Sequence, residues 1–102
     1  MSNPEQEVEL ETIERNYWID MAQALERLHD NKDFQEVILK GYFQDKAINQ
    51  VSMLADEGVK RQGQRPDLME QLVAISQLQD HFITIRNLGA THLQDLDDEI
   101  EG

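Results

Sequence analysis

Apolar residues recur at intervals of three and four along two long segments of this 102-residue sequence. That spacing is typical of one face of an α-helix, and neither segment shows the alternation of a β-strand. The first series is Leu10, Ile13, Tyr17, Met21, Ala24 with Leu25, and Leu28; the second is Leu68, Leu72, Ile75, Leu78, Phe82, Ile85 and Leu88. We therefore expect an all-α protein, an antiparallel helical hairpin or a small bundle of three or four helices with an acidic C-terminal tail.

Residues 29–57 contain signals for shorter helices between the two long ones. Asp33 and Glu36 have the spacing of a capping box, which predicts that a second helix begins there. Asp45 can cap a third short helix, for which Gly58 is a suitable C-terminal stop. A single bent helix over residues 33–57 is the alternative.

Glycine, proline and charge suggest the domain boundaries. Pro66 begins the last long helix, and Gly89 stands where a helix-terminating glycine is expected. We expect a flexible acidic lead over residues 1–9, one helical domain over residues 10–89, and an acidic tail over residues 90–102 that is largely disordered on its own. Leu93, Leu96 and Ile100 keep helical spacing, so a partner could order this tail as a helix.

The formal net charge is -12 and most of it lies near the two ends of the sequence. So acidic a chain offers few cations for a phosphate backbone, and direct nucleic-acid binding is disfavoured. The one basic cluster is Lys60, Arg61 and Arg65 in the predicted loop over residues 58–66. It is either a solvated turn or a contact for an acidic partner or nucleic acid, and these three residues are the candidate partner contact.

The apolar face of the first helix is too wide for one neighbour, because Trp18 lies beside the main series and broadens it. A chain this short has little material to cover such faces, and self-association would bury them. We predict an interface that consists of Tyr17, Trp18, Met21, Phe82 and Ile85.

The sequence offers no catalytic signature, so we expect a protein that is not an enzyme and has no catalytic, cofactor-binding or metal-binding residues. Glu26 and His29 have E-x-x-H spacing, but no second such pair exists to complete a di-metal site. There is no Cys, which excludes disulfides and thiolate ligands. No apolar run approaches the roughly 20 residues of a membrane span, and the acidic N-terminus is opposite in charge to a signal peptide.

Residues 14–88 resemble a group of small acidic helical proteins of tailed bacteriophages, described as coil-containing or virion-associated. The resemblance is carried by Tyr17 with Trp18, by Asp33 with Phe34, by the Gly41-Tyr42-Phe43 run, and by residues 74–78. It implies a non-enzymatic role in a phage particle or its assembly, with localisation in the host cytoplasm and incorporation into the virion. It supplies no active-site residues.

We therefore expect a structural or adaptor protein that associates with itself and with other virion or assembly proteins, without a membrane. The alternative is an acidic inhibitor that mimics DNA and binds a basic host protein which itself binds nucleic acid. A mimic needs its carboxylates on a rigid face, so the conformation of the acidic ends distinguishes the two hypotheses.

Overall fold

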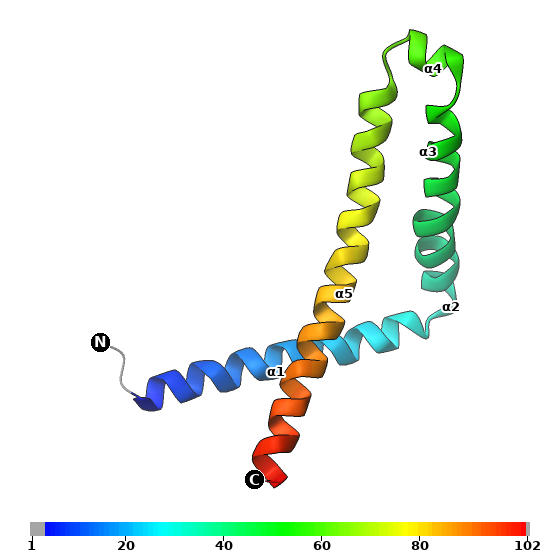
Figure 1. Cartoon of the computed structure of the whole chain (residues 1–102). Coiled ribbons are helices and arrows are strands. Elements are labelled where there is room, and N and C mark those ends of the chain that lie inside the picture. The colour runs from blue at the N-terminus through cyan, green and yellow to red at the C-terminus, as the bar shows by residue number, and fades with distance from the viewer. Residues whose placement is uncertain (1–3, 102) are drawn as a thin grey trace. The chain divides into compact units, whose positions relative to one another are not determined.

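The computed structural model describes residues 4–101, and every regular element in that range is helical (Figure 1). The elements are α1 (Pro4–His29), α2 (Lys32–Phe34), the π-helix η1 (Gln35–Lys46), α3 (Ala47–Leu54), α4 (Glu57–Arg61) and α5 (Arg65–Glu101). The expected all-α class is confirmed for this part of the chain, whereas the arrangement as a bundle stays a prediction.

Helix α1 begins at Pro4, earlier than the sequence suggested. Of the expected flexible lead, residues 4–9 are helical, and residues 1–3 lie outside the described range. Proline suits the first helical position because its missing N–H would have no partner there. Glu5 and Glu7 lie in the first turn, where the helix dipole favours negative charge.

The corner after α1 is capped by a residue other than the expected one. The side chain of Asn31 accepts a hydrogen bond of 3.0 Å from the backbone N–H of Phe34, and Asn31 has the extended backbone of an N-cap. Asp33 lies inside the first turn of α2. The side-chain amide of Gln35 donates to the carbonyl of His29 at the end of α1, where the last carbonyls of a helix need partners from outside it.

Residues 32–54 are helical without interruption through α2, η1 and α3. The structure thus agrees with the single-helix alternative rather than with a separate third helix capped by Asp45. This run ends at Leu54, and Asp56 caps α4 by accepting from the N–H groups of Gly58 and Val59 at 2.8 and 3.1 Å. Gly58 therefore lies near the start of α4 and does not end α3.

The π-helical form of η1 agrees with the spacing of most of the apolar residues in and around it. A helix with i→i+5 hydrogen bonds has about 4.4 residues per turn, and this period brings the half-buried residues Phe34, Ile38, Leu39, Tyr42, Phe43 and Ala47 onto one face. Val37 lies outside that face and is 64% exposed. A period of 3.6 would place Asp45 beside Phe34 and turn Phe43 to the opposite side.

The chain divides into two compact units, of which unit 1 comprises Met1–Leu28 and Phe82–Gly102 and unit 2 comprises His29–His81. In unit 2 the run α2–η1–α3 lies beside the first part of α5 (Figure 1). Two hydrogen bonds join these segments: Gln50 Nε2 donates to Gln71 Oε1 at 2.6 Å, and Arg65 Nε donates to the Leu54 carbonyl at 3.0 Å.

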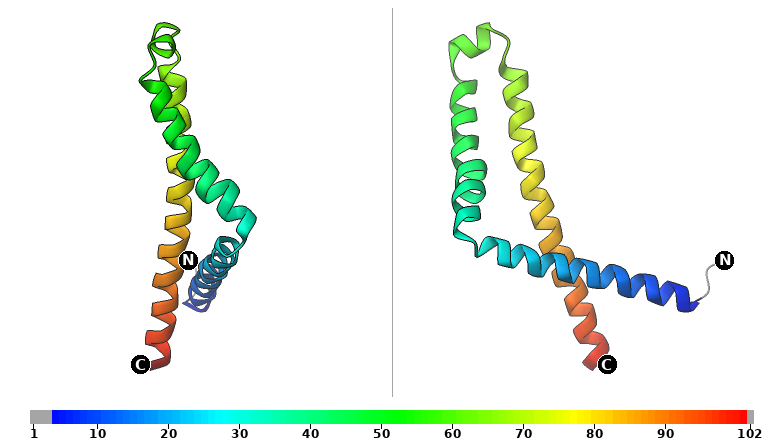
Figure 2. Two further views of the ribbon diagram at one scale, coloured as in Figure 1. Left: turned by 90° about the vertical axis from the view of Figure 1, so that its right-hand side faces the viewer. Right: turned by 180° about the vertical axis from the view of Figure 1, so that it is seen from behind.

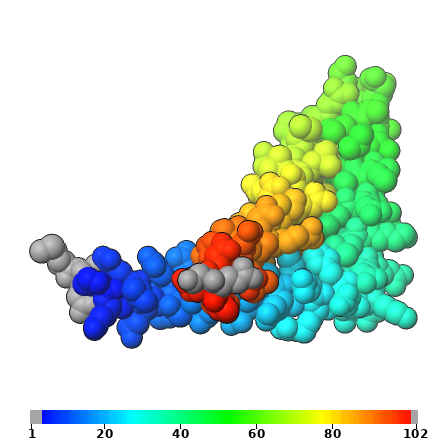
Figure 3. All heavy atoms as spheres, turned by 60° about the horizontal axis from the view of Figure 1, so that its bottom comes forward, coloured from blue at the N-terminus to red at the C-terminus, as the bar shows by residue number. Residues whose placement is uncertain are grey.

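In unit 1, α1 crosses the second part of α5 (Figure 2), and the last turns of α5 lie across α1 in the space-filling view (Figure 3). The crossing point is Gly89, which is buried. A Cβ atom on Gly89 would lie 2.3 Å from Cβ of Ala22 and 3.1 Å from the carbonyl oxygen of Trp18. The missing side chain of Gly89 therefore permits this close approach of the two helices.

Helix α5 continues through Gly89 to Glu101, so the expected stop at Gly89 is wrong and residues 90–101 of the expected tail are helical. In unit 1 the less exposed positions of α5 include the seven-residue series Phe82, Gly89 and Leu96. Such a repeat is the pattern of a helix that packs against a neighbour. Gly89 belongs to this packing face, which explains why it does not terminate the helix.

Candidate interaction surfaces

The main apolar series of α1 faces away from α5. Leu10, Ile13 and Tyr17 are 64%, 66% and 53% exposed, whereas the positions that turn inward are Trp18, Ala22 and the buried Leu25. We call the series Leu10, Ile13, Tyr17, Met21, Ala24 and Leu28 the outer face of α1. The outer face continues into the covered side through the half-buried Met21 and Trp18, so α5 covers only part of a wide apolar surface.

All five residues of the predicted interface belong to unit 1. The rings of Tyr17 and Trp18 meet edge to face with centroids 5.0 Å apart, and Tyr17 is the more exposed of the two. Met21 and Phe82 are half-buried, and Ile85 is buried within the chain. The fold thus leaves Tyr17, Trp18 and Met21 accessible to a partner, while Ile85 contributes to the core.

Carboxylates border the outer face of α1 on both sides. Helical geometry places Glu14 on one side and Glu9 and Asp20 on the other, and all three are exposed. Arg27, also exposed, lies on the Glu9 side near the end of the face. These residues belong to the more acidic unit: unit 1 holds twelve Asp and Glu against three Arg, a net charge of -9. Unit 2 holds nine acids against six bases, a net charge of -3. The apolar face of α1 therefore lies in a strongly negative field.

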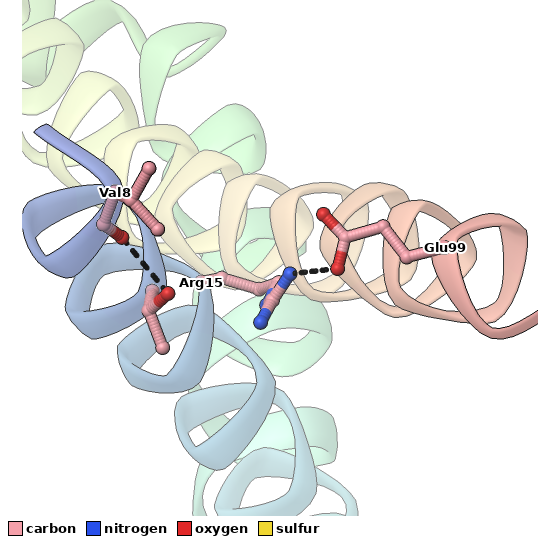
Figure 4. Close-up of polar contacts among 4 residues, drawn as sticks. Val8, Arg15 and Glu99 are labelled. Atoms are coloured by element: carbon pink, nitrogen blue, oxygen red, sulfur yellow. Dashed lines mark hydrogen bonds and ion pairs between the residues drawn. The ribbon is translucent and has the colours of Figure 1, made fainter. Parts of the chain in front are cut away.

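Unit 1 also contains a pocket of about 200 Å³ lined by Glu11, Glu14, Arg15, His92, Asp95 and Glu99. Arg15 Nη1 lies 2.8 Å from Glu99 Oε2 in an ion pair between α1 and α5 (Figure 4). Glu99 is largely exposed whereas the Arg15 side chain is mostly covered, and the Arg15 Nε atom is buried without a hydrogen-bond partner among the described residues. Sequence reasoning missed this pocket because its residues come from both ends of the chain.

Unit 2 exposes a second apolar series, on α3. Ile48 and Val51 are 66% and 56% exposed and lie three residues apart, so they share one side of the helix. We call these two residues with the exposed Ala55 the outer face of α3. The opposite side of α3 turns inward and includes Gln50, which is only 7% exposed. Its Oε1 atom has no hydrogen-bond partner among the described residues.

The candidate partner contact Lys60, Arg61 and Arg65 is divided between two roles. Lys60 and Arg61 are exposed in the last turn of α4, where positive charge is favoured by the helix dipole. Arg65 instead donates to the carbonyl of Leu54 at the end of α3, which gives it a structural role. Lys60 and Arg61 thus remain candidates for a partner, and their contact with one stays a prediction.

Between residues 4 and 101, no group of three or more His, Asp or Glu side chains is placed to hold a metal ion. His29 of the Glu26/His29 pair packs its ring edge to face against Phe34, with centroids 5.6 Å apart. None of the helices described is long and apolar enough to cross a membrane.

Comparison with known proteins gives no relative: no protein-family model matches the chain, and neither the curated proteins nor the solved structures contain a significant match.

Proposed function

We propose that this protein is a non-enzymatic structural or adaptor subunit that acts through association of its exposed helix faces, with itself and with partner proteins. The observation that carries the proposal is the uncovered apolar surface in both units, Leu10, Ile13 and Tyr17 on α1 and Ile48 and Val51 on α3. Burying large apolar side chains against another helix is favourable by about 1.5–3 kcal/mol for each one fully removed from water. The role in a phage particle or its assembly rests on the resemblance of residues 14–88 alone.

The charge distribution favours the outer face of α3 for self-association. Two copies of unit 1 would bring together two surfaces of net charge -9, whereas unit 2 carries only -3. Repulsion between like charges opposes association of unit 1 with itself, and added salt screens that repulsion. This differs from the prediction made from sequence, which placed the homo-oligomer interface on Tyr17, Trp18, Met21, Phe82 and Ile85.

Sedimentation of the full-length wild type and of two matched variants tests this proposal. Ile13 and Ile48 are the same residue type at the same exposure, 66%, so Ile13→Ser and Ile48→Ser remove equal apolar surface from the two faces. We expect Ile48→Ser to weaken self-association by about tenfold and Ile13→Ser to leave it unchanged. A wild type that is monomeric throughout would contradict the self-association, and the reverse ranking of the variants would return the interface to α1.

The second candidate function is the acidic inhibitor that mimics DNA, and one observation favours it. Residues 4–14 and 95–101, which carry most of the acidic ends, are helical in the same unit, so their carboxylates are not on disordered tails. A mimic would bind a basic DNA-binding protein through charge alone. Competition with duplex DNA for such a protein, unaffected by Ile13→Ser, would support the mimic over the adaptor.

A further inference from the structure

We infer that the outer face of α1 docks a basic amphipathic helix of a partner protein. The inference rests on the proposed adaptor function and names the chemistry of the partner. Leu10, Ile13 and Tyr17 are more than half exposed, and Met21, Ala24 and Leu28 continue the series to the end of the helix. The face is thus already formed and lacks a cover within the part of the chain that the structure describes.

The shape of this face fits a helix. Its residues advance by three or four positions, so they form a stripe along one side of α1, about 27 Å long from Leu10 to Leu28 at about 1.5 Å per residue. A second helix that presents residues at i, i+3, i+4 and i+7 can pack its ridge along such a stripe. Five turns of contact call for a partner helix of about 18 residues.

The charge around the face identifies the partner as basic. Glu9, Glu14 and Asp20 border the stripe and are exposed, and no ion pair that involves any of them is found among residues 4–101. A helix with Lys or Arg beside its apolar ridge would place cations against these three carboxylates. A second copy of unit 1 would place negative charge against these carboxylates, because its net charge is also -9.

The pocket of unit 1 extends the same acidic surface. Glu14 both borders the outer face and lines the pocket, where Glu11, Asp95 and Glu99 are also present. Arg15 pairs with Glu99, and no ion pair to the other three carboxylates is found among residues 4–101. A long basic side chain on the docked helix can reach from the stripe into this pocket, which orients the partner helix along α1.

The test uses the full chain and two synthetic probes. The first is a fluorescently labelled amphipathic peptide of about 18 residues, with Leu on its apolar face and Lys elsewhere; the second replaces every Lys by Glu. Fluorescence anisotropy at low salt reports binding. We expect the Lys peptide to bind the wild-type chain with an affinity that falls as salt rises, and the Glu peptide not to bind.

Matched variants then locate the contact. Ile13→Ser should weaken binding of the Lys peptide by about tenfold, and Ile48→Ser, equally exposed in unit 2, should leave it unchanged. The triple change Glu9→Gln, Glu14→Gln and Asp20→Asn should also weaken binding by about tenfold. The control removes three other exposed carboxylates, from unit 2, by Glu36→Gln, Glu70→Gln and Asp80→Asn, and should leave most of the affinity.

Each contrary outcome overturns the inference. Binding that depends on the carboxylates but not on Ile13 would indicate charge attraction alone, as expected of a DNA mimic. Equal loss from Ile13→Ser and Ile48→Ser would show that the peptide does not recognise α1. Self-association that Ile13→Ser abolishes would make a second copy the occupant of this face. Because the proposed self-association is read from Ile48→Ser by sedimentation, its failure is distinguishable from a failure of peptide binding.

Discussion

The crossing of α1 and α5 at Gly89 gives the sharpest prediction on stability, because the change Gly89→Ala adds one methyl group at a known position. That methyl carbon would lie 2.3 Å from Cβ of Ala22 and 3.1 Å from the carbonyl oxygen of Trp18. Non-bonded carbon atoms are optimally about 3.5–4.0 Å apart. The two helices must therefore separate by more than about 1 Å at the crossing.

Two opposing effects determine how much Gly89→Ala changes the free energy of unfolding. Alanine favours a helix over glycine by about 1 kcal/mol, which would stabilise α5. Inserting a methyl group into a well-packed contact costs about 1–3 kcal/mol, and here the obstruction includes the backbone of α1, which cannot rotate aside. We expect Gly89→Ala to lower the free energy of unfolding of unit 1 by about 1 kcal/mol, the reverse of its effect on an isolated helix.

Urea unfolding followed by tryptophan fluorescence measures this directly, because Trp18 is the only tryptophan and its carbonyl lies at the crossing. Asn87→Ala is the matched control, since Asn87 is exposed two residues earlier in α5 and should gain about 0.5 kcal/mol from helix propensity. Ala22→Gly in the Gly89→Ala background removes the closest contact and should recover part of the loss. If Gly89→Ala stabilised unit 1 as Asn87→Ala does, the close crossing would be refuted.

Three further changes test individual contacts. Gln50→Met removes a buried carbonyl that lacks a partner among the described residues but also the hydrogen bond to Gln71, so it should change the free energy of unfolding by less than about 1 kcal/mol in thermal melts; a loss above about 2 kcal/mol would mean that the carbonyl is satisfied as well. Asn31→Ala should cost about 1 kcal/mol because Asn31 caps α2, and Asp33→Ala should cost less in the same circular-dichroism melts; equal losses would restore Asp33 as the cap. Glu99→Gln should change stability by under about 0.5 kcal/mol in urea titrations, because Glu99 is largely exposed in its ion pair with Arg15; a larger loss would show that this pair holds the two helices together.

The helical class and the long helices could be predicted from apolar periodicity alone, because that signal depends only on the spacing of residues along one chain. Which side of α1 is covered could not be predicted from the sequence. Two apolar series meet on this helix, and the longer one, with Leu10, Ile13 and Tyr17, is the one left exposed. The covered side is determined by the small residue Ala22 opposite Gly89, and a contact between residues so far apart in sequence leaves no local signature.

Gly89 shows how a local rule gives the wrong result when packing competes with it. A glycine after an apolar series normally indicates a helix end, but at Gly89 the absent side chain admits a neighbouring helix. A signal was present in the seven-residue spacing that places Gly89 in register with Ile75, Phe82 and Leu96. Extending that series past the glycine would have predicted a helical C-terminus.

The π-helix had a readable signal as well. The wider turn of a π-helix brings Phe34 and Phe43 to the same side as the doublets Ile38-Leu39 and Tyr42-Phe43, whereas a 3.6-residue period places Phe34 and Phe43 on opposite sides. The charged residue Asp45 then faces away from that side. A count against a 3.6-residue period alone interprets Gly41 and Asp45 as interruptions, which is why separate helices were weighed beside one bent helix.

The measurement that tests the central claim most directly is the molar mass of the full chain in solution by light scattering, over roughly 1 to 100 µM at low and at high salt. Uncovered apolar faces on a chain of net charge -12 predict a mass that rises above 11.9 kDa with concentration, and rises further when salt screens the repulsion between copies. A mass that stays at 11.9 kDa at every concentration and salt would contradict self-association through the outer face of α3.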